Sequence, residues 1–182
     1  IVVMDDSEAQ LALTHYSQKL WNDLAQELPQ SAEFENCGTI WVAANEIEMT
    51  EVSRKERLYT ERGIGAEILD EKALGEAEPN LSRDLVGGLL IQGDSVVYQL
   101  VVTKFLMEKT LAKGGESLVG HAAIELSDKG VRLSNDHFIP AGIVINAAGP
   151  AAAKLSPGLN IKSRKGHLVI TDRYPTFARH QL

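Results

Sequence analysis

The chain has 182 residues, of which 44% are hydrophobic and 24% charged, and its net charge is −7. This composition predicts a folded globular chain, and the negative charge argues against nucleic acid or an anionic membrane surface as a partner. The one cysteine, Cys37, excludes an internal disulfide and a cysteine-based zinc site, and no apolar run approaches the roughly 20 residues of an integral membrane segment.

The ends of the sequence do not resemble natural termini. Ile1 opens the chain without an initiator Met or a signal peptide, and Leu182 directly follows a strand-like segment. We therefore expect a fragment of a longer, cytoplasmic protein. Strand edges exposed by truncation favour association between copies of the chain, so a homo-oligomer is a possible partner state.

The first half of the chain predicts helices alternating with strands. Ser7 with Gln10, and Asn45 with Glu48, have the spacing of helix N-terminal caps. Apolar residues at steps of three and four follow Ser7, and Pro29 ends that pattern. The expected elements are a helix over residues 8–28, a strand over 34–44, a helix from Asn45 to Gly63, a short strand after it, a helix over 70–78 and a strand over 85–92.

The second half predicts a helix, a small β-meander and a buried strand. A helix that crosses between two strands implies a parallel pair, and hence an α/β layer. Three branched apolar residues at 143–145 suit a strand covered on both faces. The expected elements are a helix over 98–113, strands over 116–119, 121–127, 131–133 and 137–139, the buried strand at 143–145, a helix after Pro150 and a strand over 166–171.

The turn after residue 145 is built from very small side chains. Ala147, Ala148 and Gly149 leave room for another backbone or a ligand to approach. A strand, a small turn and a helix N-terminus together form a site for a phosphate-bearing cofactor. A tight strand-to-helix connection without a ligand explains the turn equally well, and the residues alone do not separate the two interpretations.

Other catalytic signatures are absent from the sequence. It has no His-Glu-x-x-His, P-loop or Gly-x-Ser-x-Gly motif, and its five histidines lack metal-ligand spacing. The carboxylate pairs Asp5-Asp6 and Glu76/Glu78 are explained by helix capping and solvation. No catalytic residue can therefore be named from the chain, and no metal site is expected.

An ordered set of short motifs resembles the FAD-dependent amino-acid oxidoreductases of the D-amino-acid oxidase, glycine oxidase and sarcosine oxidase family. The resemblance covers about residues 8–175, and the turn at Asn146 to Pro150 is its most specific part. The motifs are Gly38-Thr39-Ile40-Trp41-Val42, Leu69-Asp70-Glu71-Lys72-Ala73-Leu74 with Glu78-Pro79, Gly88-Leu89-Leu90 with Gly93-Asp94, Asn146-Ala147-Ala148-Gly149-Pro150, and Lys165-Gly166-His167-Leu168.

The resemblance implies a flavoprotein with two domains. Residues 98–155 belong to an incomplete dinucleotide-binding α/β layer for FAD, and residues 1–97 and 156–182 belong to a mixed-sheet α+β substrate domain. The turn Ala147-Ala148-Gly149 is expected to face the FAD diphosphate and ribose. Ala123, with Ala122 beside it, occupies the strand position whose backbone meets the adenine, although ordinary strand packing also explains these two alanines.

Two parts of the family pattern are missing. The Gly-x-Gly-x-x-Gly turn and its acidic partner should lie upstream of Ile1. The arginine that grips the substrate carboxylate has no match, because Arg173 and Arg179 lie too early. We therefore expect this fragment alone to be inactive.

The resemblance implies an activity for the whole protein. It would take a hydride from the carbon beside the nitrogen of a small amino acid or amine, with flavin as the acceptor. A non-catalytic binding domain of the same fold and an FAD-dependent 2-hydroxy-acid dehydrogenase are the alternatives.

Overall fold

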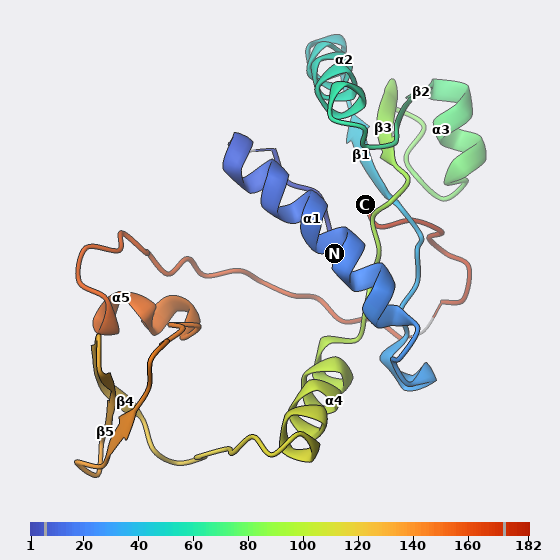
Figure 1. Ribbon diagram of the computed structural model, residues 1–182. Helices are drawn as coiled ribbons and strands as arrows, with labels where there is room; N and C mark the ends of the chain where they lie inside the picture. Colours follow the sequence, from blue (N-terminus) through green and yellow to red (C-terminus); the bar gives the residue numbers. More distant parts are fainter. Residues whose placement is uncertain (6, 173) are drawn as a thin grey trace. The chain divides into compact units, whose positions relative to one another are not determined.

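The computed structural model (Figure 1) describes residues 1–5, 7–172 and 174–182. It divides into two compact units, which are Ile1–Thr110 with Arg173–Leu182, and Leu111–Asp172. Two residues named from the sequence lie outside the described residues, namely Asp6, the neighbour of Asp5, and Arg173, which lies too early to be the substrate-binding arginine.

The first unit is organised around a three-stranded antiparallel sheet. Its strands are β1 (Thr39–Ala43), β2 (Ala66–Asp70) and β3 (Gly87–Ile91), in the order β1-β3-β2. Leu89 in the central strand lies opposite Trp41 of β1 and Ile68 of β2. Each of these strands was expected, although β1 is shorter than the predicted 34–44.

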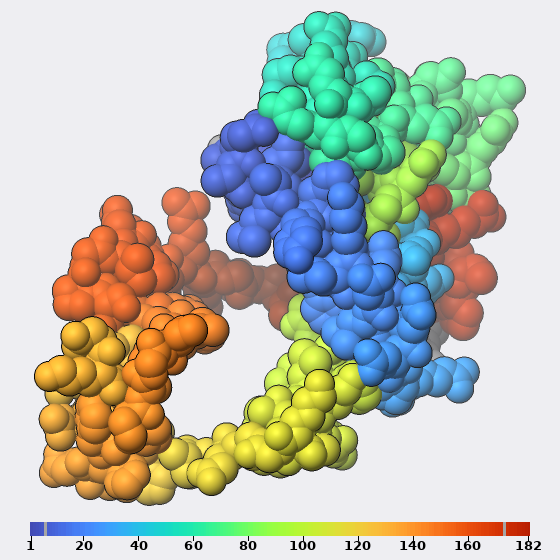
Figure 2. Space-filling model, viewed as in Figure 1, coloured from blue at the N-terminus to red at the C-terminus, as the bar shows by residue number. Residues whose placement is uncertain are grey.

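Helices cover both faces of this sheet because side chains alternate along β3. Leu89 and Ile91 share a buried cluster with residues of α1 (Glu8–Ala25) and α2 (Glu46–Glu61). Leu90, on the opposite face, packs against a second cluster that includes Leu74 of α3 (Glu71–Ala77). The result is a helix–sheet–helix arrangement, with α2 and α3 on either side of the strands in Figure 1. Atoms of α2, teal in Figure 2, lie on the surface of this unit.

The predicted helix caps are confirmed. Ser7 Oγ accepts the amide hydrogen of Gln10 at 3.2 Å, and Asn45 Oδ1 accepts that of Glu48 at 3.0 Å. These bonds satisfy amide groups that have no partner in the first helical turn. The first helix ends at Ala25, before Pro29, and a short 3₁₀ turn η1 (Gln30–Ala32) follows.

The second unit holds the predicted β-meander. Strands β4 (Ala123–Ser127), β5 (Gly130–Leu133) and β6 (Phe138–Pro140) form an antiparallel sheet in the order β4-β5-β6. After it come a 3₁₀ turn η2 (Gly149–Ala151) and the short helix α5 (Ala152–Leu155), which packs against β4. Helix α4 (Gln99–Ala112), predicted over 98–113, precedes the meander.

Three predicted strands are wrong. Residues 116–119, 143–145 and 166–171 form no strand, and the expected burial of 143–145 is also wrong because Ile143 and Ile145 are each 84% exposed. Branched residues favour strands only where a neighbouring strand and a surface are present to receive them. The described ladders are antiparallel, so the parallel pair inferred from the crossover helix is wrong as well.

The mixed α/β class predicted from the sequence is confirmed. The two compact units divide at residues 110 and 172, not at 97 and 155. This division describes packing within the chain and does not test which residues hold the cofactor. The assignment of 98–155 to an FAD layer and the rest to a substrate domain therefore stays a prediction.

Candidate functional site

The side chain of Asn146 organises the turn that the sequence analysis singled out. Its Nδ2 donates to the carbonyl oxygen of Ala152 at 3.0 Å and to Oγ of Ser156 at 2.8 Å. Its Oδ1 accepts the amide hydrogen of Ala148 at 3.3 Å. Asn146 therefore ties the start of the turn to the first residue and to the C-terminal cap of α5.

The turn itself is open to a ligand. Gly149 has a φ of +54°, and apart from its chain neighbours and the backbone of its own helical turn, no heavy atom lies within 4 Å of where its Cβ would be. The side chains of Ala147 and Ala148 are exposed. Because these residues have almost no bulk, a ligand can reach the backbone amide groups directly.

The helix after this turn is much shorter than a phosphate-binding helix. Helix α5 spans only Ala152–Leu155, and so its macrodipole is small. The backbone amides of the turn, rather than the helix dipole, are the groups that can contact an anion here. The candidate anion site is therefore the turn at 147–149 alone, without a helix N-terminus.

Ala122 and Ala123 lie at the start of the edge strand β4. The carbonyl oxygen of Ala122 accepts the amide hydrogen of Ser134 at 2.8 Å, and Ala123 pairs with Leu133 of β5. Since β4 is at the edge of its sheet, its backbone is paired on one side only among the described strands. The packing of α5 against β4 brings the two predicted cofactor segments into one unit.

These observations fit a flavin adenine dinucleotide held through backbone groups. The turn offers open space beside Gly149, and β4 offers a free strand edge. Neither segment needs a particular side chain to contact a ligand. The five predicted residues, Ala122, Ala123, Ala147, Ala148 and Gly149, remain predictions, because geometry alone does not test them.

The first unit contains a buried carboxylate at the Gly93-Asp94 turn. Asp94 is fully buried, and its Oδ1 accepts hydrogen bonds from the Val3 amide at 3.1 Å and from Gln18 Nε2 at 2.6 Å. Its Oδ2 and Oγ1 of Thr39 are buried without a hydrogen-bond partner among the described residues. Burial raises the pKa of Asp94 above its ordinary value despite these donors.

Asp5 is a structural ion-pair partner, so its assignment to solvation is wrong. Both of its oxygens accept from Lys55 Nζ, at 2.5 and 2.7 Å, and Lys55 lies over the ring of Trp41. Burial raises the pKa of Asp5, but the hydrogen bond and charge of Lys55, aided by Arg54, hold it below the ordinary value. Asp5, Lys55 and Trp41 line a cavity of about 630 Å³ along β1.

Glu78 was also expected to be solvated, and this expectation is wrong. Its side chain is 2% exposed, and its Oε1 accepts the backbone amide hydrogens of Arg179 and His180 at 2.7 and 2.6 Å. Sequence reasoning missed this role because its partners lie about a hundred residues away. The available signal was a carboxylate at a helix C-terminus, where the helix dipole disfavours it.

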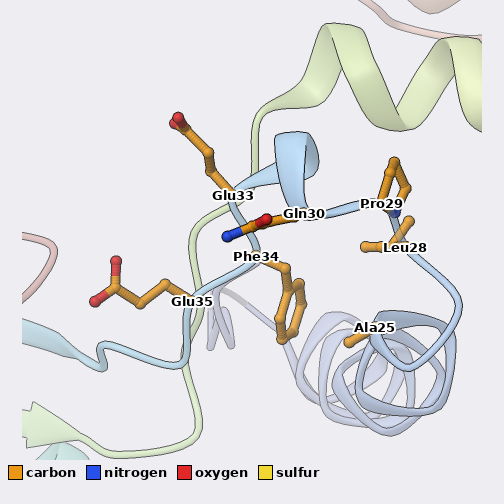
Figure 3. Close-up of a pocket in the computed structure, with 7 residues that line it drawn as sticks. All are labelled: Ala25, Leu28, Pro29, Gln30, Glu33, Phe34 and Glu35. Carbon is orange, nitrogen blue, oxygen red and sulfur yellow. The ribbon is translucent and has the colours of Figure 1, made fainter.

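A second cavity, of about 580 Å³, lies beside the end of α1 (Figure 3). Phe34 points toward Ala25, whereas the carboxylates of Glu33 and Glu35 extend away from that ring. Two carboxylates in the lining make this cavity unsuited to the anionic diphosphate of FAD. None of the predicted cofactor residues lines it.

In the part of the chain that the structure describes, no group of three or more histidine, cysteine, aspartate or glutamate side chains is placed to hold a metal ion. None of the helices in this part combines the length and apolar character that crossing a membrane requires.

Comparisons with known proteins define the class of this fold. The chain superposes on glycine oxidase from Geobacillus kaustophilus with a TM-score of 0.71 at 22% identity, covering 82% of this chain and 42% of that one. It superposes on L-proline dehydrogenase from P. horikoshii with a TM-score of 0.75 at 19% identity, covering 85% and 42%. At these identities the likeness shows a shared fold alone.

Residues 3–181 match the family of FAD dependent oxidoreductases, and the chain belongs to this family. The resemblance drawn from the motifs is thereby confirmed, and FAD is the cofactor of the family. L-2-hydroxyglutarate dehydrogenase from Escherichia coli is 26% identical over 133 residues, which are 71% of this chain and 31% of the relative. The chain thus spans about a third of the length of this curated relative.

Proposed function

We propose that this chain is part of an FAD-dependent oxidoreductase that oxidises the carbon–nitrogen bond of a small amino acid or amine. The family match over residues 3–181 is the observation that carries the proposal. The amino-acid preference is supported by the fold shared with glycine oxidase and with L-proline dehydrogenase. In such a reaction the substrate carbon loses a hydride and its nitrogen loses a proton, and water hydrolyses the resulting imine of an amino acid to an oxo acid with release of ammonia or an amine.

The second unit would contribute the backbone contacts of the cofactor. The Ala147–Gly149 turn would receive the diphosphate and ribose, and the start of β4 at Ala122 and Ala123 would meet the adenine. When bound, FAD supplies the hydride acceptor. The residues of this chain bind and orient it, and no nucleophilic side chain is required of them.

A 2-hydroxy-acid dehydrogenase is the second candidate. It is favoured by the 26% identity to L-2-hydroxyglutarate dehydrogenase over 71% of this chain. A hydroxy acid and an amino acid both carry a carboxylate beside the oxidised carbon, so the same flavin position serves either substrate. A non-catalytic binding domain that keeps this fold without flavin is the third candidate, and it predicts no flavin affinity even for the whole protein.

Anaerobic reduction of the flavin in the whole protein separates these candidates. The purified protein would be mixed in turn with glycine, sarcosine, L-proline, D-alanine and L-2-hydroxyglutarate, and bleaching of the visible flavin absorbance would be followed. We expect an amino acid or amine to bleach it. Bleaching by the hydroxy acid alone would select the second candidate, and a whole protein that binds no flavin would favour the third.

A further inference from the structure

Asn146 has the only polar side chain between Ile143 and Gly149. It is half-buried, whereas Ala147, Ala148 and Gly149 are exposed. Both ends of its amide group are engaged, since Nδ2 donates to Ala152 and Ser156 and Oδ1 accepts from Ala148. No apolar or purely accepting side chain of this size can form the same set of bonds.

These bonds fix the backbone of the turn from one side. The amide hydrogen of Ala148 is taken by Asn146, and its carbonyl oxygen accepts from Ala151 at 3.1 Å. Both backbone groups of the middle residue therefore have partners within the turn. The amides of Ala147 and Gly149 form no hydrogen bond with another described residue and remain available to a ligand.

The attachment to α5 makes the arrangement more than a local turn. The carbonyl oxygen of Ala152 accepts from both Asn146 Nδ2 and the Ser156 amide, at 3.0 and 2.9 Å. Ser156 Oγ also accepts from Asn146. Helix α5 in turn packs against β4, the strand that carries Ala123. Asn146 thus joins the turn by hydrogen bonds to helix α5, which packs beside the predicted cofactor segment at Ala123.

We propose that Asn146 is a positioning residue for FAD, which holds the Ala147–Gly149 backbone in the conformation that receives the diphosphate. This inference rests on the proposed function, which places the diphosphate at that turn. A turn that is already ordered loses less conformational freedom on binding, and so binds its ligand more tightly. Asn146 itself need not touch the cofactor.

The test is a titration of FAD into the apoprotein form of the whole protein, followed by flavin fluorescence. Asn146→Ala removes the three bonds, and Ser156→Ala removes one of them with less disturbance of folding. Asn135→Ala is the matched control, since Asn135 Oδ1 accepts the His137 amide at 3.1 Å in an exposed turn of the same unit. Hydrogen exchange of residues 143–156 without FAD is the second readout.

We expect Asn146→Ala to raise the Kd for FAD about tenfold, which corresponds to the loss of roughly one turn-fixing hydrogen bond. Ser156→Ala should raise the Kd about two- to threefold, and Asn135→Ala should leave it unchanged. Exchange within 143–156 should accelerate in Asn146→Ala in the absence of FAD. If Asn146→Ala does not fold, the Ser156→Ala result decides the inference.

Two outcomes overturn the inference while leaving the proposed function intact. In the first outcome the wild-type protein binds FAD, and the Kd of Asn146→Ala equals that of Asn135→Ala. If Asn146→Ala does not fold, the same comparison is made with Ser156→Ala. The other is a Kd that rises without any change in exchange over 143–156. If the wild-type protein itself does not bind FAD, the proposed function fails, and the inference fails with it.

Discussion

Glu78 and His180 are joined across 102 residues of sequence by a contact of 2.8 Å between Oε1 and Nδ1. The same oxygen accepts the backbone amides of Arg179 and His180. Next to this contact, Gln181 pairs with β1, where the amide of Ile40 donates to the Gln181 carbonyl oxygen at 2.8 Å. The buried carboxylate of Glu78 and the pairing of Gln181 with β1 thus both anchor the C-terminal residues to the first unit.

Replacing the Glu78 carboxylate should loosen the attachment of the C-terminal residues. We expect Glu78→Ala to lower the free energy of unfolding by about 2 kcal/mol, because buried hydrogen bonds to a charged group are lost. Hydrogen exchange over 177–182 should accelerate, as measured by mass spectrometry. The control is Glu76→Ala, whose carboxylate is 70% exposed in a 3.8 Å ion pair with Lys72, and it should cost less than about 0.5 kcal/mol. Equal effects of the two variants would contradict the anchoring role.

The buried Asp94 predicts a particular dependence of stability on pH. Because burial raises its pKa in the folded state above the ordinary value of 3.8, the folded protein holds this proton more tightly than the unfolded chain does. The protonated Asp94 contributes its full stability at pH values below 3.8, and this contribution is lost as the pH rises through the pKa of Asp94 in the folded state. A neutral asparagine side chain in its place would not show this loss.

We therefore expect Asp94→Asn to gain stability relative to the wild type as the pH rises from below 3.8 to neutral. Denaturant unfolding at a series of pH values measures the difference between the two proteins. Asp84→Asn, at an exposed aspartate, is the control variant. A difference that stays constant with pH would rule out a raised pKa.

Gly88 allows the close approach of β1 and β3. A Cβ at this position would lie 2.7 Å from the carbonyl oxygen of Trp41, so the two strands would have to separate. We expect Gly88→Ala to lower the free energy of unfolding by about 2 kcal/mol. Beyond its own helix backbone and chain neighbours, Gly75 of α3 has no atom within 4 Å of its Cβ position, and Gly75→Ala should instead add about 0.5 kcal/mol. Thermal unfolding of both variants checks the opposite signs.

Gly149 links the turn conformation to cofactor binding. Its φ of +54° strains any other residue by about 1 kcal/mol. Gly149→Ala should therefore disturb the turn and weaken FAD binding about fivefold in the whole protein, measured by equilibrium titration. Gly142→Ala is the matched control, since Gly142 has open space around it and no positive φ. Identical affinities of the two variants would place the cofactor elsewhere.

Local signals in the sequence were enough to predict most of the helices. Ser7 and Asn45 cap their helices as expected, because a cap depends only on residues three positions apart. Strands β1, β2 and β3 were also predicted, since each has a partner within the first unit. The segment 143–145 has the same strand propensity and forms no strand, because propensity does not supply a partner.

The candidate site likewise has features that the sequence predicts and contacts that it does not. The small side chains of Ala147, Ala148 and Gly149 could be recognised in the sequence, and so could the family motif around them. The role of Asn146 depends on Ala152 and Ser156, six and ten residues later. Glu78 depends on partners about a hundred residues away. Such contacts arise only when the chain has folded, and a single sequence does not contain them.

The most direct test of the account is a titration of FAD into the whole protein that contains this chain, followed by flavin fluorescence and visible absorbance. The account predicts saturable binding with a flavin spectrum typical of a protein-bound cofactor. It also predicts that Gly149→Ala weakens this binding while Gly142→Ala does not. Absence of binding at FAD concentrations up to about 1 mM, which corresponds to a binding free energy weaker than about −4 kcal/mol, would contradict the assignment of this chain to a functional flavoenzyme.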